Sequence, residues 1–480
     1  MSINRRNFLK GSLFGTGAMV SAFAGATSFE DIEKSIKRGI EKGRSKKPLF
    51  NMCWYAAPPI PVARIGYIGL GSRGNWAVNR MLNIDHIEIT ALCDIDEKAV
   101  NKCQQSLKDL NKQPAKEYYG SEDAWKKLCE QDDIDLIYIA TPWKWHVPMA
   151  LYAMECGKHV AVEVPAATTL EDCWKLVETS ERTKKHCMQL ENCCYDFFEI
   201  LTVNMAQKGL FGEIIHGEGA YIHDLLRGMF GEPSYPGWRW DENHKSGNMY
   251  PTHGLGPVCW AMNINRGDKM EYLTSMSTDD FMMKEMAKQL AQENNYYKPM
   301  AQMEYRGNMN TSTIRTNKGK TIMLQHDVSS PRPYSRIHLL SGSKAFALKY
   351  PEPGKIAFGH EFISDEKMKE LEDQYTPEMV KHIADIAKVI GGHGGMDFIM
   401  DWRMIDCLRN GLPLDMDVYD AAAWSCITPL SMWSVMNRSN SIDIPDFTRG
   451  AWKNNAPVDL TLRGGGNTNI VKQKTNPSTY

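Results

Sequence analysis

Three glycines in the segment GYIGLGSRG, which are Gly69, Gly71 and Gly74, have the spacing G-x-G-x-x-G. They follow a short strand-like apolar run and stand where a helical segment begins, which is the context of a dinucleotide-binding loop. In such a loop the first glycine permits a tight turn, the second lets the backbone approach a pyrophosphate, and the third lets helix and strand pack closely. The amide groups at the helix start bind the phosphates. The loop therefore predicts a bound dinucleotide; the alternative is a plain glycine turn.

Asp94, which ends another apolar run twenty residues after Gly74, indicates which dinucleotide is bound. Its carboxylate can accept hydrogen bonds from both ribose hydroxyls and repels a 2′-phosphate, so NAD is favoured over NADP. Ser72 and Arg73 complete the loop, and we expect Arg73 to lie along the pyrophosphate or the adenine. The expected cofactor is NAD.

A second cluster, ATPWKWH, stands at the end of a later strand-like run. Ligands of doubly wound sheets gather at the carboxyl ends of the strands. We therefore expect Trp143 and His146 to contact the nicotinamide half of the cofactor. The alternative is that His146 caps the helix that it opens.

Several possible metal ligands are scattered between residues 216 and 393, yet none has zinc-like spacing such as H-E-x-x-H or paired C-x-x-C. The sequence therefore predicts no metal in catalysis. The side chains considered are His216, His223, Asp224, His244, His253 and His393.

The elements that position the glycine loop lie in residues 62–191, where strand-like and helix-like segments alternate. This alternation predicts parallel βαβ units and a Rossmann-type doubly wound sheet. The expected strands are 62–68, 87–93, 134–140, 159–163 and 188–191, and the expected helices are 75–83, 97–110, 146–156 and 170–183.

Residues 192–463 have a different pattern and predict a second domain of the α+β type. A helix at 197–208 leads into a strand at 214–222, and strand-like runs follow one another between 272 and 348 without long helices. Such an order favours a mostly antiparallel sheet. We expect helices at 396–410 and 418–436 to cover this sheet, and a loosely ordered tail at 464–480.

The N-terminus predicts export. Within residues 1–30, paired arginines (Arg5 and Arg6) precede NFLK, an apolar stretch and an A-x-A-like cleavage site, which together resemble a twin-arginine signal. The alternatives are an ordinary secretory signal or an uncleaved anchor. A charged, helical arm and a proline-rich linker are expected at 31–61. The 12 cysteines are scattered and mostly lie in apolar segments, so we expect free thiols, folding before export, and a periplasmic or otherwise exported protein.

Composition limits the partners. The 480 residues include 56 basic and 58 acidic side chains, for a formal net charge of -2, so nucleic acid and anionic lipid are not expected partners. No segment after the signal approaches the roughly 18 apolar residues of a spanning helix, so we expect no stable membrane insertion once the signal is removed. A homodimer through the open face of the second sheet is a further possibility.

Two resemblances sharpen this interpretation. Glu163, Val164 and Pro165, after the segment KHVAV, resemble the E-K-P element of the Gfo/Idh/MocA oxidoreductases, in which the lysine serves the hydroxyl being oxidised. Val164 stands in its place. The segments LENCCYD, YPTHG, RPY, GHGGMD and IPDFTRGAWKNN resemble family 109 of the glycoside hydrolases, the NAD-dependent α-N-acetylgalactosaminidases, and the likeness runs over about residues 62–455.

This resemblance implies hydrolysis of terminal α-linked N-acetylgalactosamine with NAD used twice. The 3-hydroxyl is oxidised to a ketone, the C2 proton is lost and the glycosidic oxygen leaves, water adds, and the ketone is reduced back by the same cofactor. No net oxidation results, and the two carboxylates of ordinary glycosidases are not needed. The rivals are a net sugar or cyclitol dehydrogenase, which Val164 argues against, and a sugar-binding module in which NAD is structural.

The resemblance also implies site residues. His253 is the expected base for the 3-hydroxyl, in place of the missing lysine, and Tyr195 is expected to handle the C2 proton if its pKa is lowered. Tyr250 could exchange roles with Tyr195. Glu163, Val164 and Asn192 are expected beside the nicotinamide ribose. The sugar and its acetamido group are expected to contact Tyr221, Arg239, Tyr250, His253 and Tyr334, unless these tyrosines are packed core rings.

Overall fold

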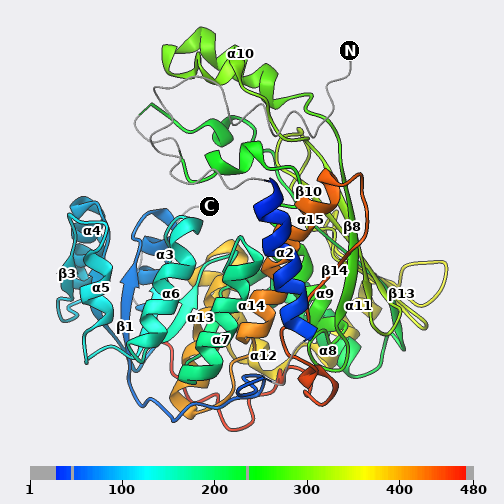
Figure 1. Ribbon diagram of the computed structural model, residues 1–480. Helices are drawn as coiled ribbons and strands as arrows, with labels where there is room; N and C mark the ends of the chain where they lie inside the picture. Colours follow the sequence, from blue (N-terminus) through cyan, green and yellow to red (C-terminus); the bar gives the residue numbers. More distant parts are fainter. Residues whose placement is uncertain (1–28, 45–47, 234–236, 472–480) are drawn as a thin grey trace.

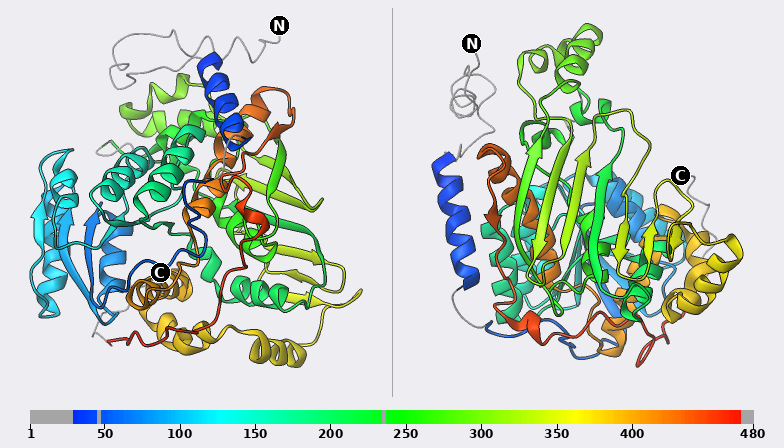
Figure 2. Two further views of the ribbon diagram at one scale, coloured as in Figure 1. Left: turned by 60° about the horizontal axis from the view of Figure 1, so that its bottom comes forward. Right: turned by 90° about the vertical axis from the view of Figure 1, so that its right-hand side faces the viewer.

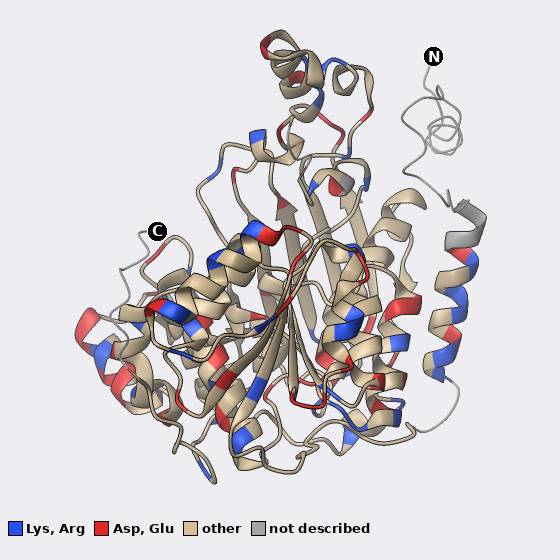
Figure 3. Ribbon diagram, turned by 90° about the vertical axis from the view of Figure 1, so that its left-hand side faces the viewer, with Lys and Arg blue, Asp and Glu red and all other residues tan. Residues whose placement is uncertain are grey.

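The computed structural model describes residues 29–44, 48–233 and 237–471. The expected signal peptide lies almost wholly outside these residues. Two sheets dominate the fold, and the helices lie between and around them (Figure 1). Among the described residues, no helix is long and apolar enough to cross a membrane. Basic and acidic residues are interspersed along the ribbon in Figure 3.

The first sheet is the expected Rossmann-type sheet. Its six strands have the order β3-β2-β1-β4-β5-β6 and are all parallel. The strands are β1 Ala63–Ile68, β2 Ile87–Cys93, β3 Lys116–Tyr118, β4 Leu136–Ile139, β5 His159–Val162 and β6 Cys187–Gln189. The helices of this region are α3 Ser72–Met81, α4 Glu97–Asp109, α5 Ala124–Cys129, α6 His146–Glu155 and α7 Leu170–Thr183. Strand β3 and helix α5 are short elements that the sequence did not predict.

The second sheet has eight strands in the order β13-β12-β11-β7-β10-β9-β8-β14. Strands β7 and β10 pair in parallel and the other neighbours are antiparallel, which confirms a mostly antiparallel sheet. Figure 2 shows one broad face of it turned to the viewer. The strands are β7 Ile214–Ile222, β8 Met270–Ser277, β9 Asn310–Thr316, β10 Thr321–Asp327, β11 Leu339–Gly342, β12 Phe346–Leu348, β13 Lys355–Ala357 and β14 Ile442–Asp443.

The helices of the second domain do not all cover its sheet. Helix α15 packs on β8, and α9 packs on β7 and β10, whereas α13 packs on α3 and β1 of the Rossmann-type domain. The expectation that residues 396–410 cover the antiparallel sheet is therefore wrong, and the expected helix 418–436 is two helices that meet at Cys426. The bounds are α8 Phe197–Gln207, α9 Thr252–Ala261, α10 Met283–Glu293, α11 Asp365–Tyr375, α12 Glu378–Ile390, α13 Met396–Asn410, α14 Val418–Ser425 and α15 Ile427–Met436.

Both ends of the described chain pack on the Rossmann-type domain. Helix α2, Phe29–Arg44, lies against α7, and the Trp174 indole donates a hydrogen bond to the Gly39 carbonyl at 2.8 Å. Ile470 forms a β-bridge with Ile84. Residues 464–471 are therefore ordered against the fold, which corrects the expectation of a loose tail for this part; residues 472–480 lie outside the described chain.

Candidate active site

The three loop glycines meet three different steric demands. Gly69 has φ +89°, and a Cβ there would stand 2.6 Å from the Ala140 carbonyl oxygen. A Cβ on Gly74 would stand 1.9 Å from the Gly69 carbonyl oxygen, so only glycine lets α3 start this close to the loop. A Cβ on Gly71 would meet nothing within 4 Å. We call the open space over Gly71, between two tightly packed glycines, the cradle; the sequence predicts a pyrophosphate there.

Asp94 braces this loop. Its carboxylate accepts hydrogen bonds from the Leu70 amide at 2.6 Å and from the Asp96 amide at 2.9 Å. An ionised carboxylate has about four acceptor positions. The remaining positions can accept further hydrogen bonds, and the contact of Asp94 with the ribose hydroxyls of NAD stays a prediction.

Arg73 lies elsewhere than expected. Its guanidinium donates from Nε to Glu163 Oε1 at 2.6 Å and from Nη1 to Asp397 Oδ2 at 2.8 Å. The Arg73 side chain is therefore held by these two carboxylates, whereas we expected it to lie along the pyrophosphate or the adenine. The sequence analysis did not single out Asp397, although it lies in the GHGGMD segment that carried the family resemblance.

Asp397, at the start of α13, is a buried hub. It accepts hydrogen bonds from Asn192 and His393 as well as from Arg73, and Arg80 lies 3.5 Å from Oδ2. Burial would raise the pKa of Asp397, but Arg73 and Arg80 outweigh burial and hold this pKa well below its usual range. The carboxylate therefore stays ionised and orients Asn192.

His146 and Trp143, which were both expected beside the nicotinamide, have different surroundings. The His146 ring is buried, with Nδ1 2.8 Å from the Pro165 carbonyl oxygen and Nε2 2.7 Å from the Thr141 carbonyl oxygen. Both ring nitrogens are thus used by the backbone, so His146 braces the turn after Glu163 and is not free for the nicotinamide. Burial lowers the pKa of His146 even though both carbonyls favour the protonated ring. Trp143 lies with its ring centroid 5.7 Å from that of Tyr250.

Val164 is buried in the apolar cluster that also contains Tyr221 and Tyr250. The lysine position of the E-K-P element thus presents methyl groups to this cluster. A proton acceptor for a sugar hydroxyl must come from another part of the chain.

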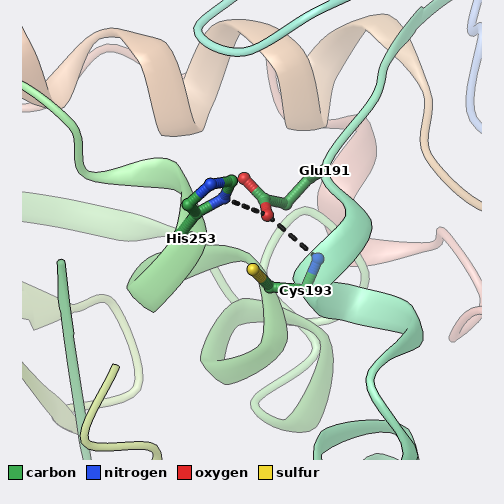
Figure 4. A group of neighbouring side chains, drawn as sticks. All are labelled: Glu191, Cys193 and His253. Atoms are coloured by element: carbon green, nitrogen blue, oxygen red, sulfur yellow. Dashed lines mark hydrogen bonds and ion pairs between the residues drawn. The ribbon is translucent and has the colours of Figure 1, made fainter. Parts of the chain in front are cut away.

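His253 supplies that group. It is the second residue of α9, and its Nδ1 lies 2.6 Å from Oε1 of Glu191, which is fully buried just beyond β6 (Figure 4). Glu191 also accepts the Cys193 amide at 3.1 Å. Burial would raise the pKa of Glu191, but the charge and hydrogen bond of His253 outweigh it, so this pKa is lowered. The sequence analysis missed Glu191, whose signal was its place in the LENCCYD segment.

Close backbone packing holds His253 in place. A Cβ on Gly254 would stand 2.3 Å from the Ala220 amide nitrogen, so α9 lies directly on β7. Glycine is therefore required at position 254, because any side chain there would push α9 away from β7. It fixes how far the imidazole projects from the sheet.

The expected sugar-binding side chains surround His253. The ring centroids of Tyr250 and Tyr221 lie 4.8 and 5.5 Å from that of His253. The Arg239 guanidinium lies 5.5 and 6.0 Å from the Tyr250 and Tyr221 rings. Tyr334 meets Tyr221 edge-on at 6.3 Å. The structure thus gathers all five residues, and burial raises the pKa of Tyr250 and Tyr221, which keeps their hydroxyls protonated.

A cleft of about 590 Å³ adjoins this group. It is bordered by Tyr334 on one side and by His393, which contacts the Asp397 hub, on the other. The cleft thus shares Tyr334 with the aromatic group and His393 with the contacts of Asp397. Its further lining residues include Asp196, Arg336, Tyr350 and Glu352.

Tyr195 is not part of this group. Its ring is fully buried, its hydroxyl donates to Asp415 Oδ2 at 3.1 Å, and burial raises its pKa well above the usual range. The expected role with the C2 proton requires a lowered pKa, so the structure corrects this expectation. The side chain is instead a hydrogen-bonded core residue.

Ligand atoms of Glu191, Cys193 and His253 lie within 4.8 Å of one another, which is a geometry that could hold a metal ion. The histidine nitrogen and the carboxylate already pair with each other. Burial raises the pKa of the Cys193 thiol well above its usual range, so it stays protonated and is a poor ligand. Catalysis without a metal stays a prediction.

Comparison with known proteins agrees with this geometry. Residues 63–190 match the model of the oxidoreductase family with an NAD-binding Rossmann fold, and residues 195–454 match the C-terminal domain of glycosyl hydrolase 109. The chain is 51% identical over 409 residues to the alpha-N-acetylgalactosaminidase of Bacteroides fragilis, covering 83% of this chain and 95% of that protein. It is 50% identical over 412 residues to a glycosyl hydrolase family 109 protein of Porphyromonas gingivalis, covering 82% and 86%.

Solved structures share the fold at low identity. A levoglucosan dehydrogenase in complex with NADH and levoglucosan has a TM-score of 0.59 at 14% identity, covering 80% of this chain and 99% of that chain. The scyllo-inositol dehydrogenase of Lactobacillus casei has a TM-score of 0.56 at 12% identity, covering 80% and 99%. The fold is that of NAD-binding oxidoreductases, and the enzyme is a glycoside hydrolase. The chain belongs to glycosyl hydrolase family 109.

Proposed function

We propose that this enzyme releases terminal α-linked N-acetylgalactosamine from glycans, with one NAD molecule retained and recycled in every turnover. The observation that carries the proposal is the His253–Glu191 pair, which stands beside the cofactor side of the fold where Val164 replaces the family lysine. The relative named alpha-N-acetylgalactosaminidase supports the choice of sugar.

His253 does the proton chemistry. Donation from Nδ1 to Glu191 fixes the ring tautomer and leaves Nε2 as the basic nitrogen. Nε2 takes the proton of the 3-hydroxyl and later returns a proton to that oxygen. NAD, when bound, accepts the hydride from C3 and gives it back. The resulting ketone acidifies the C2 proton, whose loss expels the glycosidic oxygen.

The tyrosines orient the sugar. Because burial keeps Tyr250 and Tyr221 protonated, their hydroxyls serve as hydrogen-bond donors rather than as bases. Arg239 donates to the Tyr221 hydroxyl at 3.5 Å and so supports that group. After Nε2 has passed the proton of the 3-hydroxyl to water, the imidazole can accept a second proton, so it is also our candidate acceptor for the C2 proton.

The cleft beside Tyr334 supports a glycan rather than a free sugar as substrate. Its volume of about 590 Å³ exceeds the space that one ring needs, and it opens next to the aromatic group. We assign the sugar to His253 and its neighbours and the remainder of the glycan to the cleft.

The test uses purified protein without added NAD and an aryl α-N-acetylgalactosaminide in deuterated water. Release of the aryl alcohol with deuterium at C2 of the sugar is the expected result. Stoichiometric accumulation of NADH without aryl alcohol would establish the dehydrogenase instead. No turnover of any kind would favour the sugar-binding module.

We also propose export to the periplasm through the twin-arginine signal. Replacement of Arg5 and Arg6 by lysine should leave the folded protein in the cytoplasm, as followed by cell fractionation. Normal export of that variant would contradict the proposal. The possible homodimer is tested on the same purified protein by light scattering.

A further inference from the structure

Arg73 joins three segments that are far apart in the sequence. It is the second residue of α3, and its guanidinium reaches Glu163, which follows β5, and Asp397, which begins α13. Asp397 is fully buried and the Glu163 side chain is 10% exposed, while the Arg73 side chain is 25% exposed. We call Arg73, Glu163 and Asp397 the Arg73 latch.

The latch crosses the place where a dinucleotide binds. The glycine loop follows β1 and Glu163 follows β5, and β4 lies between these two strands in the sheet. The guanidinium therefore passes over the carboxyl end of β4, in the crevice where doubly wound sheets bind dinucleotides. A cofactor that extends from the cradle over Gly71 toward Glu163 lies against this guanidinium.

We propose that the Arg73 latch is what keeps NAD in place between turnovers, so that cofactor release requires Arg73 to leave both carboxylates. This inference rests on the proposed function, in which one NAD molecule is recycled. Opening the latch takes the Arg73 charge away from the buried Asp397 carboxylate and leaves it with Arg80, Asn192 and His393, and loss of one charged partner from a buried ion pair is unfavourable. The latch consequently opens seldom, and the cofactor exchanges slowly.

A second arginine–aspartate pair between the same two helices provides the matched control. Arg80 donates from Nε to Asp401 Oδ2 at 3.0 Å, one turn further along α13. This pair links α3 to α13 as the latch does, and Arg80 also lies 3.5 Å from Asp397, but Asp401 bonds to Arg80 rather than to Arg73. A general effect of helix packing would be seen at both aspartates, and an effect of the latch at Asp397 alone.

The experiment measures cofactor exchange in the full-length protein. The protein is loaded with NAD and mixed with excess deuterium-labelled NAD, and the mass of the NAD released by denaturation is followed over time. Asp397→Asn should exchange at least about tenfold faster than the wild type, since a buried pair has lost its charge. Asp401→Asn should exchange close to the wild-type rate. Arg73→Lys should also exchange fast, because lysine keeps the charge but lacks the planar guanidinium that bonds to Glu163 and Asp397 at once.

Two results with the variants would overturn the latch: wild-type exchange in both Asp397→Asn and Arg73→Lys, or equal acceleration in Asp397→Asn and Asp401→Asn. Fast exchange in the wild type would overturn it as well, even if glycosides are hydrolysed with added NAD. The assay contains no glycoside. A protein that retains NAD but releases no N-acetylgalactosamine would refute the proposed function and leave the latch standing.

Discussion

His253 acquires its chemistry from one neighbour. A histidine in a sequence is equally suited to a core, a cap or a catalytic site, and the Glu191 carboxylate 2.6 Å from Nδ1 selects among these by fixing the tautomer. The phenols around it are held protonated by burial. At the scale of single residues, the imidazole moves protons and the tyrosines orient the sugar.

Replacement of His253 by alanine should lower kcat/KM by about 100-fold or more, which is the usual contribution of a positioned base. Glu191→Gln should cost about tenfold, since the amide can keep the contact but not the charge. Release of aryl alcohol measures both, and NAD content shows that the site remains loaded.

Cys193→Ala should retain most activity, because the Cys193 backbone amide and not its thiol contacts Glu191. Loss of activity in Cys193→Ala would instead point to a metal.

Tyr195→Phe tests whether the Tyr195 hydroxyl acts on the C2 proton, as the sequence predicted, or stabilises the core, as the structure indicates. The hydroxyl is bonded to Asp415 in the core, so its removal should lower the free energy of unfolding by about 1–3 kcal/mol. Turnover at a temperature where the variant is folded should stay near the wild-type value. Urea unfolding and kcat are measured on the same preparation. A loss of turnover by orders of magnitude with unchanged stability would restore Tyr195 as an acid–base group.

At the scale of elements, helix α9 was not expected from the sequence, and helix α13 was expected over the correct residues but on the wrong sheet. Helix α9 lies between β7, β10 and α8, and almost all residues of α13 are buried between the two domains. Such helices show no apolar stripe and no polar face, so periodicity cannot place them. These two helices carry His253 and Asp397.

Alanine substitutions in the glycine loop should separate folding from cofactor binding. In Gly74→Ala the new Cβ meets the Gly69 carbonyl oxygen at 1.9 Å, so the free energy of unfolding of the NAD-free protein should fall by about 1–3 kcal/mol or more. In Gly71→Ala the Cβ enters open space, so stability should be nearly unchanged while NAD affinity falls. Thermal unfolding and NAD titration test the pair. Equal NAD binding in Gly71→Ala and wild type would show that the cradle is not the pyrophosphate site.

Asp397 and Asp401, both in α13, should affect acid stability in opposite directions. The lowered pKa of Asp397 stabilises the fold above about pH 4, and this contribution is lost as pH falls further. The pKa of Asp401 is raised to about 6 by burial, so stability is lost as pH rises from about 4 to 6. Asp397→Asn should flatten the acid loss, and Asp401→Asn should flatten the decline above it. Urea unfolding across this pH range measures both, and a same-sign change would contradict the assignment.

At the scale of the whole molecule, the domain limits drawn at 62–191 and 192–463 describe the two sheets but not the helices around them. Helix α13 and the final described segment both pack on the Rossmann-type domain. The Thr468 hydroxyl donates to Asp406, and the Trp402 indole donates to the Thr468 carbonyl. Thr468, near the end of the described chain, thus holds α13 through hydrogen bonds to Trp402 and Asp406.

Truncation after Arg463 should lower the free energy of unfolding by about 3 kcal/mol or more, because the bonds that it removes include three to the buried Asp406 and Trp402 side chains, worth about 1 kcal/mol each. In these three bonds the Thr468 hydroxyl and the Gly466 amide donate to Asp406, and the Trp402 indole donates to the Thr468 carbonyl. Truncation after Val471 keeps them and is the control. Urea unfolding compares the two chains, and equal stability would show that the segment does not fasten α13.

The sequence by itself determined the parallel sheet, the glycine loop with Asp94 and the mostly antiparallel second sheet. These depend on local spacing and periodicity, which persist in one dimension. Only the tertiary structure decided that Glu191 holds His253, that Arg73 turns to Glu163 and Asp397, and that Tyr195 lies in the core. Arg73 and Asp397 are 324 positions apart and Glu191 and His253 are 62 apart. Such pairs form because a charge that packing removes from water is unfavourable unless an opposite charge lies beside it. The two partners can be far apart in the sequence, so local spacing and periodicity do not predict the pair.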